Sequence, residues 1–265
     1  MSTQKLEVYV FALACAVTAT LMAQQPIVGY DDTPMQPDGK WRIHDGKRSQ
    51  PRVVSPGPAS FTLVPPPADA IVLIGAGSDT GAWQMSSDAS PVTWVMKDGV
   101  LPTGKGMIRT KAEFTDFQLH VEFATPSEVK GDSQGRGNSG VFLLGVFEVQ
   151  VLDSYRNQTY PDGSAAALYG QHPPLVNASR PPGEWQTYDI VFSAPRFKEG
   201  STLDRPAVVT VVHNGVVVHN ATPFWGPTAH RRIDPYTPAS ARGPIALQDH
   251  GNPVRYRNVW IRPLS

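Results

Sequence analysis

The sequence predicts an all-β fold in which short antiparallel strands form a sandwich or jelly roll of two sheets. Three observations support this fold class. The 265 residues include 23 glycines and 26 prolines, and each internal proline would cost a helix about 3 kcal/mol. Short apolar or alternating segments follow one another between turn residues. No segment keeps a 3.6-residue hydrophobic period, and the length suits one large β domain with appendages.

The charge balance excludes two classes of protein. The chain has 23 basic and 23 acidic side chains, and only 17% of its residues are charged. Neither a highly charged disordered protein nor a polycationic nucleic-acid binder has this composition. We therefore expect no nucleic-acid partner. The single cysteine, Cys15, cannot form a disulfide or a zinc knuckle within one chain.

The chain begins with an apolar run from Val8 to Ala23, preceded by Lys5. This pattern is typical of a secretory signal, so we predict a signal peptide over residues 1–23 and a secreted or periplasmic protein. The run is shorter than the roughly 20 apolar residues of a membrane span, and we expect no span in the mature chain. An uncleaved N-terminal anchor is the alternative. Cys15 lies in the middle of the run, which disfavours lipid attachment.

Residues 24–68 are rich in Pro, Gly, Asp and Arg and show no hydrophobic period. We predict an extended, partly polyproline-like arm that contributes little to the core. Trp41 and Ile43 are the residues expected to attach it to the rest of the protein. The main β domain then covers residues 69–265.

Strands are expected in order along this domain. Two of them flank the turn Asp98-Gly99 and two flank Asn214-Gly215, because such dipeptides are strong signals for hairpins. Phe117 to Phe123 alternates apolar with polar residues, which predicts one buried and one wet face. The remaining expected strands are the buried run 71–74, the long apolar stretch 141–152, and segments 188–192, 245–247 and 254–261.

The stretch after Val146 places polar side chains on one face of a strand. Successive strand residues point to opposite faces, so Glu148 and Gln150 share one face while the apolar residues between them share the other. This arrangement resembles the floor of a sugar-binding cleft, and an ordinary exposed face is the alternative. Asp153 falls on the opposite parity unless the strand ends or bulges before it.

The C-terminal strands repeat this pattern. Alternation places Gln248 and His250 on one face of their strand, opposite Ile245 and Leu247. It places Arg257 on the same face as the apolar residues Val259 and Ile261. Gln, His and Arg side chains supply hydrogen bonds suited to sugar hydroxyls.

Several familiar signals are absent from the sequence. There is no nucleophile elbow, phosphate-binding loop or dinucleotide fingerprint. The histidines are scattered, so spacing shows no zinc site. The cofactor stays unknown, and a divalent cation assembled by the fold stays open.

Several motifs together resemble the 3-keto-disaccharide hydrolase family. These are Gly137-Asn138-Ser139-Gly140-Val141, the segment Phe147–Ser154, the segment Pro182–Ile190, and the two C-terminal segments Gly243–Gly251 and Arg257–Arg262. The resemblance extends in order from about Ile71 to Leu264. It implies a concanavalin A-like jelly-roll sandwich of two antiparallel sheets. It also implies a secreted enzyme that cleaves 3-keto-glycosides or 3-keto-disaccharides.

The resemblance also implies a route of cleavage. A retaining glycosidase needs two carboxylates about 5–5.5 Å apart, but the face that carries Glu148 continues with Gln150 and Leu152. Oxidation of a sugar at carbon 3 acidifies the proton on carbon 2. One base can then remove that proton, the glycosidic oxygen leaves by elimination, and water adds to the product.

The roles remain open between several residues. Glu148 or His250 is expected as the base, and Arg136 or Arg257 as the group that stabilises the enediolate. The residues expected to bind substrate are Asn138, Gln150, Asp153, Tyr169, Gln248 and Arg257. A non-catalytic carbohydrate-binding module is the alternative, in which Tyr155, Tyr169 and Trp185 would stack on sugars. A structural extracellular domain without a ligand is a third alternative.

Overall fold

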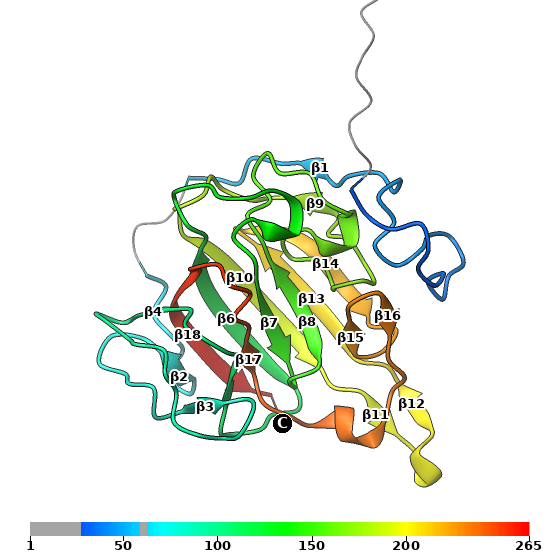
Figure 1. Ribbon diagram of the computed structural model, residues 1–265. Helices are drawn as coiled ribbons and strands as arrows, with labels where there is room; N and C mark the ends of the chain where they lie inside the picture. Colours follow the sequence, from blue (N-terminus) through cyan, green and yellow to red (C-terminus); the bar gives the residue numbers. More distant parts are fainter. Residues whose placement is uncertain (1–27, 59–62, 265) are drawn as a thin grey trace, which may run out of the picture.

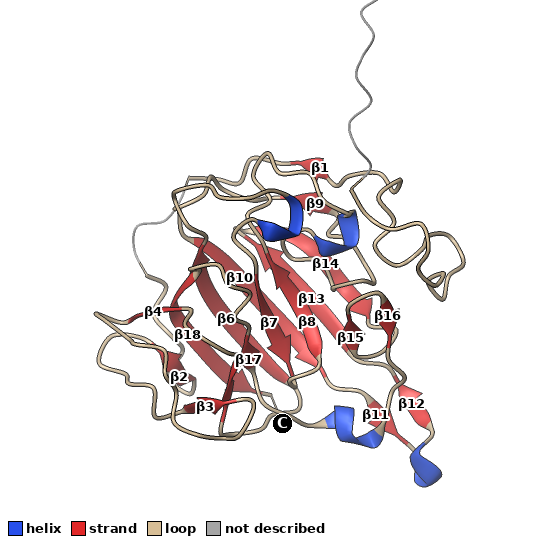
Figure 2. Cartoon of the chain, in the orientation of Figure 1, coloured by secondary structure: helices blue, strands red, loops and turns tan. Residues whose placement is uncertain are grey.

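The computed structural model describes residues 28–58 and 63–264, and these residues form a sandwich of two antiparallel sheets (Figure 1). The predicted signal peptide and Cys15 lie outside the described residues. Figure 2 shows that the described helical segments are short turns beside the sheets. They are four 3-10 helices: η1 (Ser133–Gly135), η2 (Pro161–Gly163), η3 (Glu199–Ser201) and η4 (Pro238–Ala241). Within the described residues, no helix has the length and apolar character needed to cross a membrane.

The larger sheet has seven strands in the order β14-β13-β10-β6-β18-β2, and β4 also pairs with β18. Every pairing in this sheet is antiparallel. The strands are β2 (Ile71–Ile74), β4 (Val100–Pro102), β6 (Phe117–Ala124), β10 (Gln186–Ser193), β13 (Val208–His213), β14 (Val216–Pro223) and β18 (Arg255–Pro263).

The smaller sheet lies in front of the larger one in Figure 1 and has the order β3-β5-β17-β7-β8. Its strands are β3 (Trp83–Met85), β5 (Ile108–Thr110), β7 (Ser139–Leu143), β8 (Phe147–Val151) and β17 (Ala246–Leu247). Three two-stranded pairs complete the described strands: β1 (Arg52–Val53) with β9 (Val176–Asn177), β11 (Arg196–Phe197) with β12 (Leu203–Arg205), and β15 (Thr228–Ala229) with β16 (Arg232–Ile233).

The core lies between the two sheets and follows the predicted alternation. Phe147, Val149 and Val151 of β8 are fully buried members of the core, as are the apolar residues of β6 and β10 that face them. Two tyrosine hydroxyls of the larger sheet reach across this core: Tyr188 donates to the carbonyl oxygen of Gln150 at 2.8 Å, and Tyr256 lies 2.7 Å from Ser139 Oγ. The larger sheet therefore anchors β7 and β8 from behind.

Both predicted hairpin turns are confirmed. Asn214 and Gly215 have φ values of 53° and 82°, and Asp98 and Gly99 have 52° and 74°. Positive φ at both central positions is the requirement of a type I′ turn. The expected strand before Asp98 is reduced to a single bridge between Lys97 and Val100.

Two strands are buried differently from the prediction. The run 71–74 was expected to be fully buried, but β2 lies at the edge of its sheet and leaves Ile71 46% and Val72 43% exposed. The polar face of β6 was expected to be wet. His120 and Glu122 on that face are buried, because side chains of β18 and the neighbouring loops cover them.

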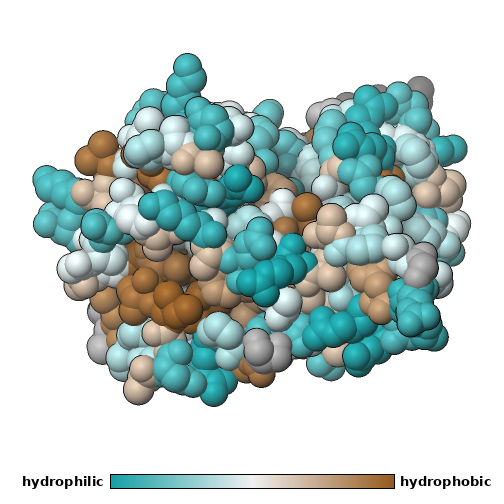
Figure 3. Space-filling view, turned by 90° about the horizontal axis from the view of Figure 1, so that it is seen from below, coloured by the Kyte–Doolittle hydropathy of each residue, from teal (hydrophilic) through white to brown (hydrophobic). Residues whose placement is uncertain are grey.

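The segment before the domain is less extended than predicted. Residues 28–48 form turns closed by a bridge between Met35 and Arg42, and β1 pairs in parallel with β9. Ile43 is buried as expected, although it lies outside the main core cluster. Figure 1 shows the segment, in blue, along one end and one side of the sandwich. Figure 3 shows that the underside is largely hydrophilic, with an apolar patch on the left.

Candidate active site

A cavity of about 410 Å³ opens on the face of β7 and β8 that points away from the core. Six of the nine predicted site residues line it: Asn138, Glu148, Gln150, Tyr169, Gln248 and His250. The sequence did not predict the other lining residues, which are Tyr30, Gln134, Phe142, Tyr160, Thr228, Ala229 and His230. The structure therefore brings together residues from the N-terminal segment, the loop after β8, the β15–β16 pair and the segment after β17.

Glu148 has the position that strand alternation predicts. Its side chain is 5% exposed, and in the described part of the chain no hydrogen-bond donor reaches its carboxylate. Burial raises the pKa of Glu148 to about 8, because the charged form loses its hydration without a compensating partner. Gly140 on β7 makes room for this carboxyl group, since a side chain there would overlap the oxygen Oε1. Among the described lining residues, Glu148 is the single carboxylate.

Two amide side chains form one wall of the cavity. Gln134 orients both of them: its Oε1 accepts from Gln150 Nε2 at 3.0 Å, and its carbonyl oxygen accepts from Asn138 Nδ2 at 2.7 Å. The remaining oxygens, Asn138 Oδ1 and Gln150 Oε1, are buried and have no partner. A buried acceptor without a donor is costly. This wall therefore keeps unused acceptor capacity next to the cavity.

Two tyrosines and a histidine form another wall. Tyr160 Oη and Tyr169 Oη are 3.0 Å apart, and Tyr169 Oη is 3.1 Å from His230 Nδ1. The backbone N–H of Tyr169 donates to the carbonyl oxygen of Glu148 at 3.2 Å, so this wall adjoins the buried carboxyl. Burial raises the pKa of both tyrosines, which keeps their hydroxyl groups protonated.

His44 of the N-terminal segment packs behind the tyrosine wall. Its ring lies 4.2 Å from the ring of Tyr160 and 4.8 Å from that of Tyr169, between centroids. Asp162 holds it with two contacts, from Oδ2 to the His44 backbone N–H at 2.9 Å and from Oδ1 to Nδ1 at 3.3 Å. His44 has a φ of 59°, which is unfavourable for a residue with a side chain. The segment expected to be a solvated arm thus supports the cavity.

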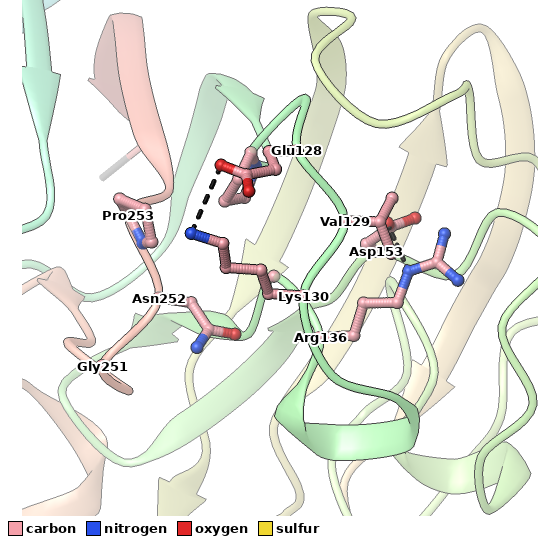
Figure 4. A pocket seen from close by; sticks show the side chains of 10 residues that line it. Glu128, Val129, Lys130, Arg136, Asp153, Gly251, Asn252 and Pro253 are labelled. Atoms are coloured by element: carbon pink, nitrogen blue, oxygen red, sulfur yellow. Dashed lines mark hydrogen bonds and ion pairs between the residues drawn. The ribbon is translucent and has the colours of Figure 1, made fainter.

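Two predicted site residues lie in a neighbouring cavity of about 170 Å³. Arg136 Nε contacts Asp153 Oδ2 at 2.7 Å, and Figure 4 shows this pair apart from Lys130, which faces Glu128 at 3.3 Å. The strand β8 ends at Val151, and Asp153 turns toward Arg136 instead of continuing the alternation. A stabiliser of the expected intermediate would have to lie beside Glu148. The structure does not place Arg136 there.

Arg257 lies on the opposite side of the molecule. Its Nε contacts Glu122 Oε2 at 2.6 Å, and its guanidinium carbon lies 4.1 Å from the ring centroid of Trp185. The prediction that Arg257 shares a face with Val259 and Ile261 is wrong. A bulge at Asn258, where φ is 45°, shifts the register of β18 against β6. Arg257 therefore points to the outer face of the larger sheet, away from the cavity.

Most of the residues that sequence reasoning missed lie outside regular strands, although Phe142 belongs to β7 and Thr228 and Ala229 belong to β15. Tyr30, Tyr160 and His230 occupy turns or loops and Gln134 lies in the short helix η1, where no strand alternation shows which way a side chain points. The pairing of His44 with Asp162 joins positions 118 residues apart. In the described residues, no group of three or more His, Cys, Asp or Glu side chains is arranged to hold a metal ion.

Comparisons with known proteins agree with this fold and show the family of the chain. The 3-keto-alpha-glucoside-1,2-lyase-like domain matches residues 69–262. A 3-keto-disaccharide hydrolase of Bacteroides thetaiotaomicron is 23% identical over 255 residues, which cover 76% of this chain and 81% of that protein.

Two solved structures from Parabacteroides distasonis, both of glycosyl hydrolase candidates, are similar to this chain. The first is 44% identical with a TM-score of 0.72, covering 82% of this chain and 93% of that one. The second is 20% identical with a TM-score of 0.52, covering 71% of this chain and 91% of that one. At this identity the similarity shows the fold alone. The chain belongs to the 3-keto-alpha-glucoside-1,2-lyase-like domain family, a glycoside hydrolase-like group of carbohydrate-active proteins.

Proposed function

We propose that this protein cleaves 3-keto-glycosides, and that Glu148 removes the proton from carbon 2 of the keto sugar. The observation that carries the proposal is a single buried carboxyl group, without a hydrogen-bond partner, in a cavity lined by hydrogen-bonding side chains. A perturbed carboxyl in such a cavity is typical of a catalytic site, whereas a binding module needs none. The name of the Bacteroides relative, a 3-keto-disaccharide hydrolase, supports the substrate class.

The lining residues favour elimination over double displacement. A second carboxylate is missing among the described residues of the cavity, so a retaining mechanism lacks its partner. In the elimination, Glu148 takes the proton of carbon 2, and the electron pair forms an enolate with the keto group at carbon 3. The enolate then returns to a ketone as a double bond forms between carbons 1 and 2, and the glycosidic oxygen leaves with the proton that Glu148 has taken. Water then adds across this double bond, with its hydroxyl on carbon 1 and its proton on carbon 2, which completes a net hydrolysis.

Glu148 is the preferred base because of its position. His250, the other candidate, lines the same cavity but is exposed at its rim. A base is most effective when its pKa lies near the working pH. Burial raises the pKa of Glu148 to about 8, which makes its carboxylate a far stronger base than an ordinary one.

The substrate class can be tested directly. The purified protein is incubated with a 3-keto-disaccharide and, in parallel, with the unoxidised parent disaccharide. The proposal expects release of the 3-keto monosaccharide from the first and no cleavage of the second, because only the keto group acidifies the proton of carbon 2. Equal cleavage of both sugars would contradict it.

The pH dependence tests the role of Glu148 as base. Because its pKa is about 8, the ionised fraction increases as the pH rises through that value. We expect kcat/KM to rise with pH and to level off above about 8. A kcat/KM that falls as the pH passes about 8 would instead identify Glu148 as the acid.

We also propose that the chain is exported, on the sequence of residues 1–23 alone. N-terminal sequencing of the protein recovered from outside the cytoplasm should then begin near Gln24. A mature protein that retains the run Val8 to Ala23 would contradict cleavage.

A further inference from the structure

We propose that Tyr169 and Tyr160 form the oxyanion site of the reaction, with the Tyr169 hydroxyl bound to the oxygen on carbon 3 of the keto sugar. This inference rests on the proposed function and assigns the group that stabilises the enolate. It replaces the arginines in that role, because Arg136 lies in another cavity and Arg257 on the outer face of the larger sheet.

The free acceptor oxygens of the amide wall do not match a keto oxygen. Gln134 occupies an N–H of each amide, and the buried oxygens Asn138 Oδ1 and Gln150 Oε1 have free lone pairs. A ketone oxygen and an enolate oxygen are also acceptors only. The free oxygens of the two amides therefore match the hydroxyl groups of the sugar, and hydroxyl donors elsewhere in the cavity match the keto oxygen.

The tyrosine wall supplies such a donor next to the base. Carbon 2 and the oxygen on carbon 3 are separated by two bonds, so the base and the oxyanion donor have to be neighbours. We assign this role to Tyr169, because its backbone N–H is bonded to the carbonyl of Glu148 and both side chains line the cavity.

The hydrogen bonds around Tyr169 favour donation to the substrate. When the Tyr169 hydroxyl donates its proton to the enolate oxygen, its own oxygen can accept from Tyr160 Oη at 3.0 Å and from His230 Nδ1 at 3.1 Å. Such a chain strengthens each of its bonds. Tyr169 remains protonated because burial, together with the nearby Glu148, raises its pKa. The proton of carbon 2 goes to Glu148, and the negative charge stays on the sugar oxygen.

His44 positions the two rings. It packs against both tyrosines from the side away from the cavity, and Asp162 fixes it through its backbone N–H and its Nδ1. Preorganised donors stabilise developing charge without having to rearrange during the reaction. His44 is therefore a positioning residue, and it does not touch the reacting atoms.

The test separates enolate formation from cleavage. The probe is 1,5-anhydroglucitol oxidised at carbon 3, which has no leaving group on carbon 1. In heavy water, nuclear magnetic resonance follows the exchange of the proton on carbon 2 for deuterium. We expect the wild-type protein to catalyse this exchange, and Tyr169→Phe to slow it by about 10²–10³-fold, the usual loss for one oxyanion donor. Probe affinity should change little.

Two further variants complete the experiment. Tyr160→Phe should slow the exchange less than Tyr169→Phe, because it removes only the second bond of the chain. Tyr236→Phe is the matched control, since its hydroxyl bonds to the backbone of Ala207 and Phe224 outside the cavity. The ring is kept in every variant, and thermal unfolding checks that each one folds.

The outcomes distinguish this inference from the proposed function. In one outcome, the wild type catalyses the exchange, Glu148→Gln does not, and the exchange rate of Tyr169→Phe stays within about threefold of the wild-type rate. This outcome would overturn the oxyanion site and leave the proposed function standing. Absence of exchange by the wild type, together with no cleavage of a 3-keto-disaccharide, would overturn the proposed function itself.

Discussion

Glu148 shows how strand alternation and burial together give a side chain unusual chemistry. Phe147 and Val149 point into the core, which forces Glu148 to the opposite face of β8. The loops then close over that face and remove the water that would solvate the charge. Alternation predicts the direction of the side chain, but the loss of water depends on loops such as that of Tyr169, which have no periodic pattern.

The pKa of Glu148 predicts a pH-dependent stability. The group has an ordinary pKa of 4.5 and a folded-state pKa of about 8. Between these values the folded protein binds a proton that the unfolded chain has lost, so the free energy of unfolding falls as the pH rises through this window. Each unit of pKa corresponds to about 1.4 kcal/mol. Glu148→Gln cannot ionise, and we expect it to be more stable than the wild type above about pH 8.

Urea denaturation at about pH 5 and about pH 8.5 measures this difference. Glu122→Gln is the control, because its effect on stability should have the opposite sign. Burial opposes ionisation of Glu122, but its bonds to His120, Asn258 and Arg257 outweigh this and lower its pKa. Its replacement should therefore destabilise the protein at neutral pH. An equal stability gap between wild type and Glu148→Gln at both pH values would contradict the raised pKa.

Arg257 shows the limit of the same reasoning. A single bulge at Asn258 reverses the parity of every residue that precedes it relative to those that follow. The sequence Arg257-Asn258-Val259 gives no local sign of this reversal beyond an asparagine that tolerates positive φ. Glu148 lies in a strand without such a bulge, and its direction could be predicted.

At the level of elements, one buried carboxylate contributes two contacts that hold the N-terminal segment to the site. Asp162 accepts hydrogen bonds from the His44 backbone N–H and from Gln36 Nε2, at 2.9 and 3.1 Å. These three residues are almost fully buried. The sequence indicates a segment without its own core, but it does not show that a turn near His44 fits against a loop more than a hundred positions away.

We predict that Asp162→Asn loosens this segment. The amide replaces one acceptor oxygen with a donor, which leaves a buried N–H without a partner at a cost of about 1–3 kcal/mol. Trypsin should then cut more rapidly at Arg42 or Arg48, while the sandwich stays intact. The control is Asp234→Asn, which removes an exposed ion pair with Arg232 and should have little effect. Unchanged cleavage in Asp162→Asn would show that other contacts hold the segment.

At the scale of the whole molecule, the sandwich brings distant segments together around one cavity. The order of the strands in each sheet does not follow the sequence, and β17 lies between β5 and β7. Local patterns predict the short strands and the two hairpin turns. They do not predict which strands become neighbours, because those contacts depend on the summed packing of both sheets. The all-β class, the amide pair Asn138 and Gln150, and Tyr169 were therefore predictable, whereas Tyr160 and His230 of the tyrosine wall were not.

The central claim is that Glu148 is the base of a glycoside-cleaving site. The most direct test measures turnover of a 3-keto-disaccharide by Glu148→Gln at about pH 8, where the wild-type carboxyl is half ionised. The glutamine keeps the volume of the side chain but cannot accept the proton. Glu122→Gln removes a buried carboxylate from the other sheet and serves as the control.

The account predicts that Glu148→Gln loses about 10²–10⁴-fold in turnover while it stays folded, and that folded Glu122→Gln retains turnover. Near-normal turnover by Glu148→Gln would contradict the account and make His250 the base.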